Sequence, residues 1–153
     1  MEIITYNVVP DKFGLRLLAA SEKGLVALFL GDDSDKLLKE LKERFPNAQL
    51  NKGNLELNES NIVIDERGTS FQKKVWKVLR QIPVGTVVTY SDIANSLGIP
   101  KAVRAIGMAC GANPIAIITP CHRVVGKNGK LTGYRWGLER KLSLLQLENR
   151  ILI

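Results

Sequence analysis

The sequence predicts a mixed α/β fold of the α+β type, in which a small N-terminal antiparallel sheet with one helix precedes a mostly helical domain. Three observations lead to this prediction. Apolar runs of strand length alternate with turn signals over the first 31 residues, helical spacing dominates after residue 68, and the charge changes sign at the same boundary. We therefore expect an N-terminal lobe over residues 1–67 and a C-terminal domain over residues 68–153.

The N-terminal lobe begins with three apolar runs, residues 3–9, 15–20 and 25–30, separated by turn residues. This pattern predicts a three-stranded antiparallel meander. Asp32, Asp33 and Ser34 then offer a helix cap, and apolar residues at helical spacing predict a helix that ends at Pro46. Residues 46–66 are predicted to form a linker with one short strand at 61–65.

The C-terminal domain is predicted to begin with a helix over residues 71–82 and a short extended piece at 87–89. Two short helices follow, over 90–97 and 102–110, and a glycine-containing turn joins them as in a helix-turn-helix. A short buried strand is expected over residues 115–119. A loop with four glycines, 126–137, then leads to a last helix marked by Leu138, Leu142 and Leu145.

The net charge of +7 is the sum of two opposite halves. Residues 1–67 hold 9 Lys and Arg against 12 Asp and Glu, a net of −3, whereas residues 68–153 hold 13 against 3, a net of +10. A basic domain of this kind is typical of a nucleic-acid binder, although solvated lysines alone would produce the same count.

Several classes of protein are not expected from this composition. The apolar runs fall far short of the roughly 18 residues that cross a bilayer, and the N-terminus lacks the features of a signal peptide, so we expect an intracellular, cytoplasmic protein. Two cysteines and one histidine do not complete a four-ligand zinc site without carboxylates. The sequence also contains no cofactor motif, and we expect neither a metal nor a cofactor.

The segment after the predicted buried strand contains the strongest chemical signal. Cys121, one of two cysteines, precedes the only histidine, His122, and Arg123. A nearby cation favours the thiolate, which is the nucleophilic form of cysteine. Because neighbours on a regular strand point to opposite faces, His122 can act as a base for Cys121 only through a turn at Cys121 or a bridging water.

The string Ile-Ile-Thr-Pro-Cys-His-Arg-Val-Val resembles the active-site signature of the O6-alkylguanine-DNA alkyltransferases. The resemblance extends over residues 68–148, through Phe-Gln-Lys-Lys-Val-Trp, Ile-Pro-Val-Gly, Thr-Tyr-Ser-Asp-Ile-Ala, Pro-Lys-Ala-Val-Arg-Ala-Ile-Gly, Ala-Asn-Pro and Gly-Tyr-Arg-Trp-Gly. Within this family the sequence is similar to the alkyltransferase domain of the bacterial adaptive-response protein. Residues 1–67 match the family only in general plan.

The resemblance implies a methylated-DNA–protein-cysteine S-methyltransferase that acts once and inactivates itself. Cys121 would accept the alkyl group from O6-alkylguanine, His122 would take its proton through a water, and Glu148 would orient His122. Tyr90 would donate a proton to the departing guanine. Asn113 would tie the recognition helix to the active-site segment by hydrogen bonds.

The implied partner is double-stranded DNA, entered from the minor groove, with the alkylated guanine flipped out of the stack. Arg104 would occupy the space that the base leaves, and Tyr90 would press on the adjacent phosphate. Ser91, Gln72 and Lys127 match positions that contact the DNA backbone.

The family also lines its guanine pocket at four positions of this sequence, Val124, Tyr134, Arg135 and Trp136. Some relatives have serine and glycine where Arg135 and Trp136 stand, so the two bulky residues are expected to narrow the alkyl pocket. Cys110 lies in an apolar helical setting and is expected to have a buried structural role.

Two other readings compete with a repair alkyltransferase. One is a helix-turn-helix regulator or lesion sensor without chemistry, although family relatives of that kind lack the acceptor cysteine. The other is a cysteine hydrolase that uses Cys121 and His122, which the basic domain disfavours because it suits a polyanion better than a peptide. We expect a monomer, and the sequence leaves open whether molecules cluster along DNA.

The charge of the C-terminal domain makes a first testable prediction. If the basic side chains of this domain contact phosphates, binding to duplex DNA releases counterions. The affinity for duplex DNA then falls by about tenfold or more between about 50 and about 200 mM salt. A titration of the protein with labelled duplex at several salt concentrations measures this. An affinity that is independent of salt would contradict the electrostatic interpretation.

Overall fold

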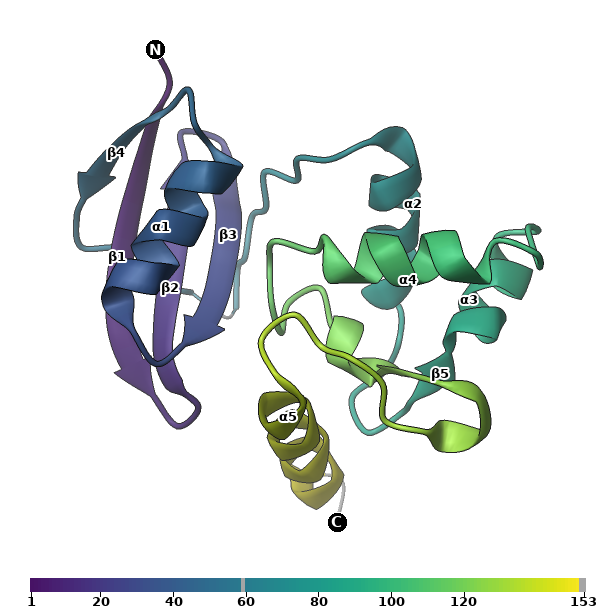
Figure 1. The fold of residues 1–153 in the computed structure, drawn as a ribbon. Helices are drawn as coiled ribbons and strands as arrows, with labels where there is room; N and C mark the ends of the chain where they lie inside the picture. Colours follow the sequence, from purple (N-terminus) through teal and green to yellow (C-terminus); the bar gives the residue numbers. More distant parts are fainter. Residues whose placement is uncertain (59, 152–153) are drawn as a thin grey trace. The chain divides into compact units, whose positions relative to one another are not determined.

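A computed structural model gives the fold and describes residues 1–58 and 60–151 (Figure 1). The chain divides into two compact units, Met1–Arg67 with Pro114–Ala116, and Gly68–Asn113 with Ile117–Ile153. The predicted domains assigned residues 114–116 to the second domain. They belong to the first unit because Ile115 pairs with Leu28 of its sheet.

The first unit is a four-stranded sheet covered by one helix. Strands β1 (Ile3–Asp11), β2 (Gly14–Ser21) and β3 (Gly24–Gly31) pair antiparallel, which confirms the predicted meander. Helix α1 (Ser34–Arg44) follows, and β4 (Gln49–Lys52) then pairs parallel with β1, so that the strand order is β3-β2-β1-β4. In Figure 1, α1 lies across one face of the sheet.

Helix α1 forms where its cap and its apolar stripe predict it. The Asp33 carboxylate accepts hydrogen bonds from the backbone N–H groups of Asp35 and Lys36, at 2.9 and 3.2 Å. Leu37 and Leu41 are buried, and the helix contacts β2 and β3. Burial of this stripe holds the helix on the sheet.

The connection between the two units differs from the prediction in two places. The strand expected at residues 61–65 is a single bridge between Ile64 and Leu25, whereas β4 was not predicted. The four residues of β4 are polar and mostly exposed, because β4 is an edge strand whose position depends on backbone pairing with β1.

The strand predicted over residues 115–119 is wrong. Only Ile115 pairs with another strand, and Ile117 then adopts a left-handed backbone conformation with φ of 70°. This conformation costs a β-branched residue roughly 1–2 kcal/mol and takes the chain out of the extended form. The chain therefore turns before it reaches Cys121, which lies in a short 3-10 helix.

The second unit contains α2 (Ser70–Leu79), β5 (Val88–Thr89), α3 (Tyr90–Ser96), α4 (Val103–Gly111), β6 (Val124–Val125) and α5 (Leu138–Ile151). Two 3-10 turns lie at Cys121–Arg123 and Lys127–Gly129, and β5 pairs parallel with β6. Helices α3 and α4 contact each other across a short turn, which confirms the predicted helix-turn-helix. The indole N–H of the fully buried Trp76 donates to the Ala109 carbonyl at 2.9 Å and joins α2 to α4.

None of the helices in the described part of the chain is long and apolar enough to span a membrane.

Candidate active site

Cys121 begins the 3-10 helix Cys121–Arg123, directly after Pro120. The three side chains of this turn are buried, and the fully buried His122 has no exposed surface. A turn at Cys121 was one of the two conditions under which the neighbouring histidine can serve the thiol. The structure therefore replaces the expected end of a strand with a tight helical turn.

Asn113 holds this turn to the end of α4. Its buried side-chain N–H₂ donates to the Thr119 carbonyl at 2.8 Å and to the Cys121 Sγ at 3.3 Å. Its backbone N–H donates to the Cys110 carbonyl at 3.2 Å, and its own carbonyl accepts from the Arg135 guanidinium at 2.9 Å. One residue thus connects the last turn of α4 with the thiol and with the loop before α5.

His122, Glu148 and Arg123 form a buried hydrogen-bonded group. The His122 Nε2 lies 2.8 Å from the Glu148 Oε2. Arg123 donates to both carboxylate oxygens, from Nε at 3.0 Å and from Nη2 at 2.7 Å, and its Nη1 donates to the Ile82 carbonyl at 2.7 Å. The two-point contact of a guanidinium fixes the plane of the carboxylate, and so fixes the group that faces His122.

The charge of Glu148 sets the proton position on His122. Burial by itself would raise the pKa of Glu148, but the hydrogen bonds from His122 and Arg123 outweigh it and lower that pKa to about 2. An ionised carboxylate only accepts hydrogen bonds, so His122 Nε2 carries a proton. In the neutral imidazole, Nδ1 is then the basic nitrogen, and this buried atom has no hydrogen-bond partner among the described residues.

The thiol itself is not activated at rest. Burial raises the pKa of Cys121, and the hydrogen bond from Asn113 opposes this only in part. The expectation that Arg123 favours the thiolate directly is wrong, because the Arg123 guanidinium is bound to Glu148 and the Ile82 carbonyl. Reaction at neutral pH therefore needs a base that removes the proton from Cys121.

A cavity of about 320 Å³ opens onto Cys121, within the range of small-ligand sites. It is bounded by α3, α4, the 3-10 turn and the glycine-rich loop. The residues that line it are Tyr90, Gly107, Cys110, Gly111, Cys121, Thr132, Gly133, Tyr134 and Arg135. Cys110 was expected to have only a buried structural role, but it also lines this cavity. Burial raises the pKa of Cys110 to about 12, so its side chain stays a thiol.

Two side chains hold the glycine-rich loop at this cavity. The Tyr90 hydroxyl and the Thr132 hydroxyl are 3.1 Å apart, and the Lys141 Nζ donates to the Thr132 carbonyl at 3.2 Å. Lys141 is fully buried, and burial lowers its pKa. Burial also raises the pKa of Tyr90, which keeps its hydroxyl proton available for donation.

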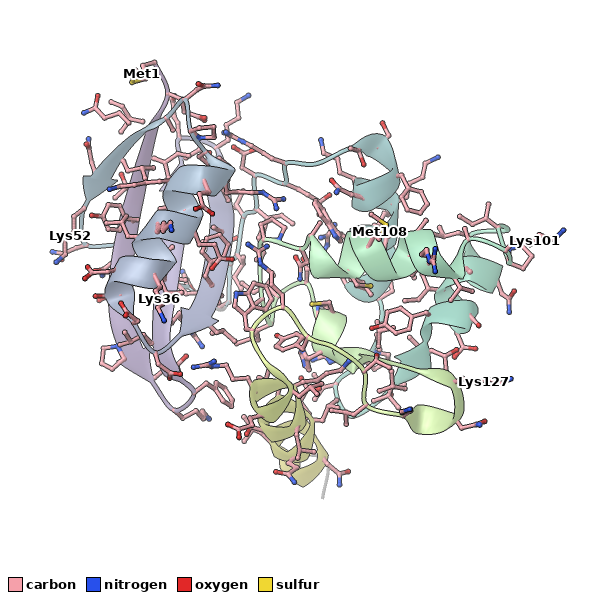
Figure 2. The ribbon with its side chains drawn as sticks, in the orientation of Figure 1. Met1, Lys36, Lys52, Lys101, Met108 and Lys127 are labelled. Carbon is pink, nitrogen blue, oxygen red and sulfur yellow. The ribbon has the colours of Figure 1, made fainter. Side chains whose placement is uncertain are left out.

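The residues predicted to contact DNA lie on four parts of the second unit, α2, α3, α4 and the loop after β6. Arg104 is exposed on α4, Ser91 is exposed at the start of α3, and Lys127 is exposed in the loop after β6, where Figure 2 labels it. Gln72 has a structural task, because its side-chain oxygen accepts from the Thr69 backbone N–H at 2.9 Å and caps α2.

The predicted base pocket is brought together only in part. Tyr134 and Arg135 line the cavity with Cys121, but Val124 and Trp136 are not among its lining residues. Val124 is fully buried in β6. Trp136 is buried beside Tyr134, and the Arg135 guanidinium lies over its ring at 5.1 Å from the centroid.

Comparison with known proteins agrees with this geometry. The family model described as the DNA-binding domain of 6-O-methylguanine DNA methyltransferase matches residues 70–150. A methylated-DNA–protein-cysteine methyltransferase of Mycolicibacterium paratuberculosis is 43% identical over 97% of this chain and 94% of its own length. This chain belongs to the O6-methylguanine-DNA methyltransferase family.

Solved structures of the family have the same fold. The O6-methylguanine methyltransferase of Mycobacterium tuberculosis superposes with a TM-score of 0.74 at 37% identity, over 96% of this chain and 93% of that one. A crystal structure of OGT from the same organism in complex with DNA gives a TM-score of 0.72 at 38% identity, over 97% and 93%.

The bifunctional transcriptional activator and DNA repair enzyme Ada of Escherichia coli is 44% identical over 95% of this chain. The chain spans 45% of the length of Ada, and so matches less than half of that protein.

The roles of two buried residues were missed in the sequence analysis. Arg123 binds the Glu148 carboxylate, and Lys141 donates to the Thr132 carbonyl of the glycine-rich loop. A signal for Lys141 was present. Lys141 and Glu148 are seven residues apart, which places them on one helix face, and that face is the buried one. The leucines that marked the helix do not define its core side, because Leu138 and Leu142 are about half exposed.

The lowered pKa of Glu148 predicts how stability depends on pH. The Glu148→Gln variant should lose about 3 kcal/mol of unfolding free energy at pH 7, because the buried Arg123 loses its charged partner. A group with a depressed pKa stabilises the fold above its ordinary value of 4.5, and this contribution is lost as the pH falls toward about 2. The difference between wild type and variant should therefore shrink over that range.

Denaturant unfolding at pH 7, 4.5 and 2.5 measures this difference. Glu139→Gln is the matched control, since Glu139 is exposed on the same helix. If the difference in unfolding free energy between wild type and Glu148→Gln stays constant down to pH 2.5, the lowered pKa of Glu148 is contradicted.

Proposed function

We propose that this protein repairs DNA by direct reversal, transferring the methyl group of O6-methylguanine in duplex DNA to Cys121 once per molecule. The observation that carries the proposal is the hydrogen-bonded His122–Glu148 pair beside a buried thiol that opens onto a cavity. Membership of the O6-methylguanine-DNA methyltransferase family and the DNA complex of the M. tuberculosis relative support it.

The chemical step follows from the state of each group. The thiol proton of Cys121 passes through a water to His122 Nδ1, while the ionised Glu148 stabilises the imidazolium that results. The thiolate attacks the methyl carbon, so that the S–C bond forms as the C–O6 bond breaks. The guanine leaves with the bonding electrons and takes up a proton, which in our proposal Tyr90 donates; its position in the wall of the cavity supports this role.

The substrate atom lies inside a base pair, so the nucleotide must leave the stack before the thiolate reaches it. In our proposal α4 enters the minor groove and Arg104 fills the space of the flipped base. Tyr90, Ser91 and Lys127 contact phosphates, and Gln72 does so through its amide nitrogen because its oxygen caps α2. The flipped guanine enters the cavity against Tyr134.

The product explains why each molecule acts once. A thioether is not reduced by cellular thiols as a disulfide is, so the methyl group stays on Cys121. We propose that the protein acts as a monomer on chromosomal DNA in the cytoplasm. The alternative is a helix-turn-helix lesion sensor without chemistry. The presence of Cys121 disfavours this alternative, because family relatives of that kind lack the acceptor cysteine.

Mass spectrometry of the intact protein tests the proposal. After incubation with duplex DNA that carries one O6-methylguanine, wild type should gain one methyl group per molecule. The Cys121→Ser variant should gain none while it still binds the duplex, and Cys110→Ser should gain one methyl group like wild type, because Cys110 stays a thiol. Binding by wild type without a mass gain would favour the lesion sensor.

A further inference from the structure

The solvent face of α4 carries two long side chains in neighbouring turns, Arg104 and Met108. Residues four apart lie on one face of a helix, and here that face is opposite the buried Ile106 and Ala109. Met108 is 72% exposed, which is more than any other large hydrophobic residue in the described chain except Met1 at 95%. Figure 2 labels Met108 on α4.

The residues around these two side chains leave the space beside them open. Gly107 and Gly111 adjoin Arg104 and Met108 on the helix surface, and a Cβ atom at either glycine would meet nothing within 4 Å. Both glycines are helical and neither has a positive φ, so the packing of the protein does not require glycine there. Glycine destabilises a helix relative to alanine, and here it leaves room for a molecule that approaches from outside.

The same glycines connect this face to the reaction centre. Gly107 and Gly111 line the cavity that opens onto Cys121, so a nucleotide that enters the cavity crosses the edge of α4 next to Arg104. At about 100° per residue, Met108 lies on the other side of Arg104 from the cavity-lining Gly107 and Gly111, so in the proposed DNA complex it would face the part of the duplex that stays stacked.

We propose that Met108 is a second DNA-inserting side chain, an apolar wedge that packs against bases and sugars of the minor groove beside the gap filled by Arg104. This rests on the proposed function of the chain. Met108 is a positioning residue for base flipping, not a catalytic one, because it does not line the cavity of Cys121.

The chemistry of methionine suits this task. Methionine is among the apolar side chains that enter base steps from the minor groove, and its flexible, polarisable chain adapts to varied surfaces. It offers no strong hydrogen-bond donor or acceptor, so the contact favours no particular sequence around the lesion. Its 72% exposed side chain leaves water only when DNA covers α4, which adds an apolar contribution to binding beyond that of Arg104.

The test compares duplex DNA with a free base. Met108→Ala should react about tenfold more slowly than wild type with an O6-methylguanine duplex, in line with the loss of one stacked or inserted group. Its reaction with free O6-methylguanine should be unchanged, because no flipping is needed. Met108→Leu should retain most of the duplex rate, and the salt dependence of binding should not change, since no charge is removed.

The matched control is Val63→Ala, which truncates a 59% exposed apolar side chain in the first unit. It should leave both rates unchanged. A wild-type duplex rate for Met108→Ala would overturn the proposal, as would an equal loss with the free base, which would indicate a structural role. If wild type transfers no methyl group at all, the proposed function fails, but the insertion of Met108 into DNA can still be tested by binding. Weaker duplex binding by Met108→Ala than by wild type would then support the insertion, and equal affinities would contradict it.

Discussion

The side chain and backbone of Asn113 form the constraint on which the rest of the site depends. Its hydrogen bonds reach the Cys110 carbonyl in α4, the Thr119 carbonyl, the Cys121 sulfur and the Arg135 guanidinium. The helix proposed to enter DNA and the proposed nucleophile are therefore held by one buried amide. Because a buried polar group left without a partner costs about 1–3 kcal/mol, loss of one of these contacts destabilises the whole connection.

Electrostatics within the second unit keep the thiol unreactive until a base acts. Burial holds Cys121 as a thiol, while Arg123 holds Glu148 ionised and Glu148 in turn fixes the proton on His122 Nε2. Arg123 thus acts on the carboxylate, whereas burial raises the pKa of Cys121 by more than Lys141 and Arg135 lower it. Lys141 adds a second buried cation that positions the loop through the Thr132 carbonyl.

Local sequence signals predicted the elements that depend on local physics. The meander, the capped helix α1 and the helix-turn-helix follow from periodicity, turn residues and capping side chains, although the sequence did not decide which of residues 32–34 is the cap. Features set by distant partners were not predictable in this way: β4 is polar and pairs only through its backbone, and the turn at Ile117 contradicts its own apolar, β-branched pattern. The site shows the same division, because Cys121 and His122 stand together in the sequence, whereas the contact of Arg123 with Glu148 spans 25 residues.

The central claim, that Asn113 couples the sulfur of Cys121 to α4, is tested most directly by the thermal stability of the methylated protein. Cys121 is 5% exposed and its sulfur accepts from Asn113, so a methyl group on the sulfur crowds this contact and strains the hydrogen bond. The account predicts that methylation on Cys121 lowers the melting temperature by about 3–10 °C. It also predicts a smaller change in Asn113→Ala, where the coupling is already lost. Equal melting temperatures for the free and methylated wild-type protein would contradict the account.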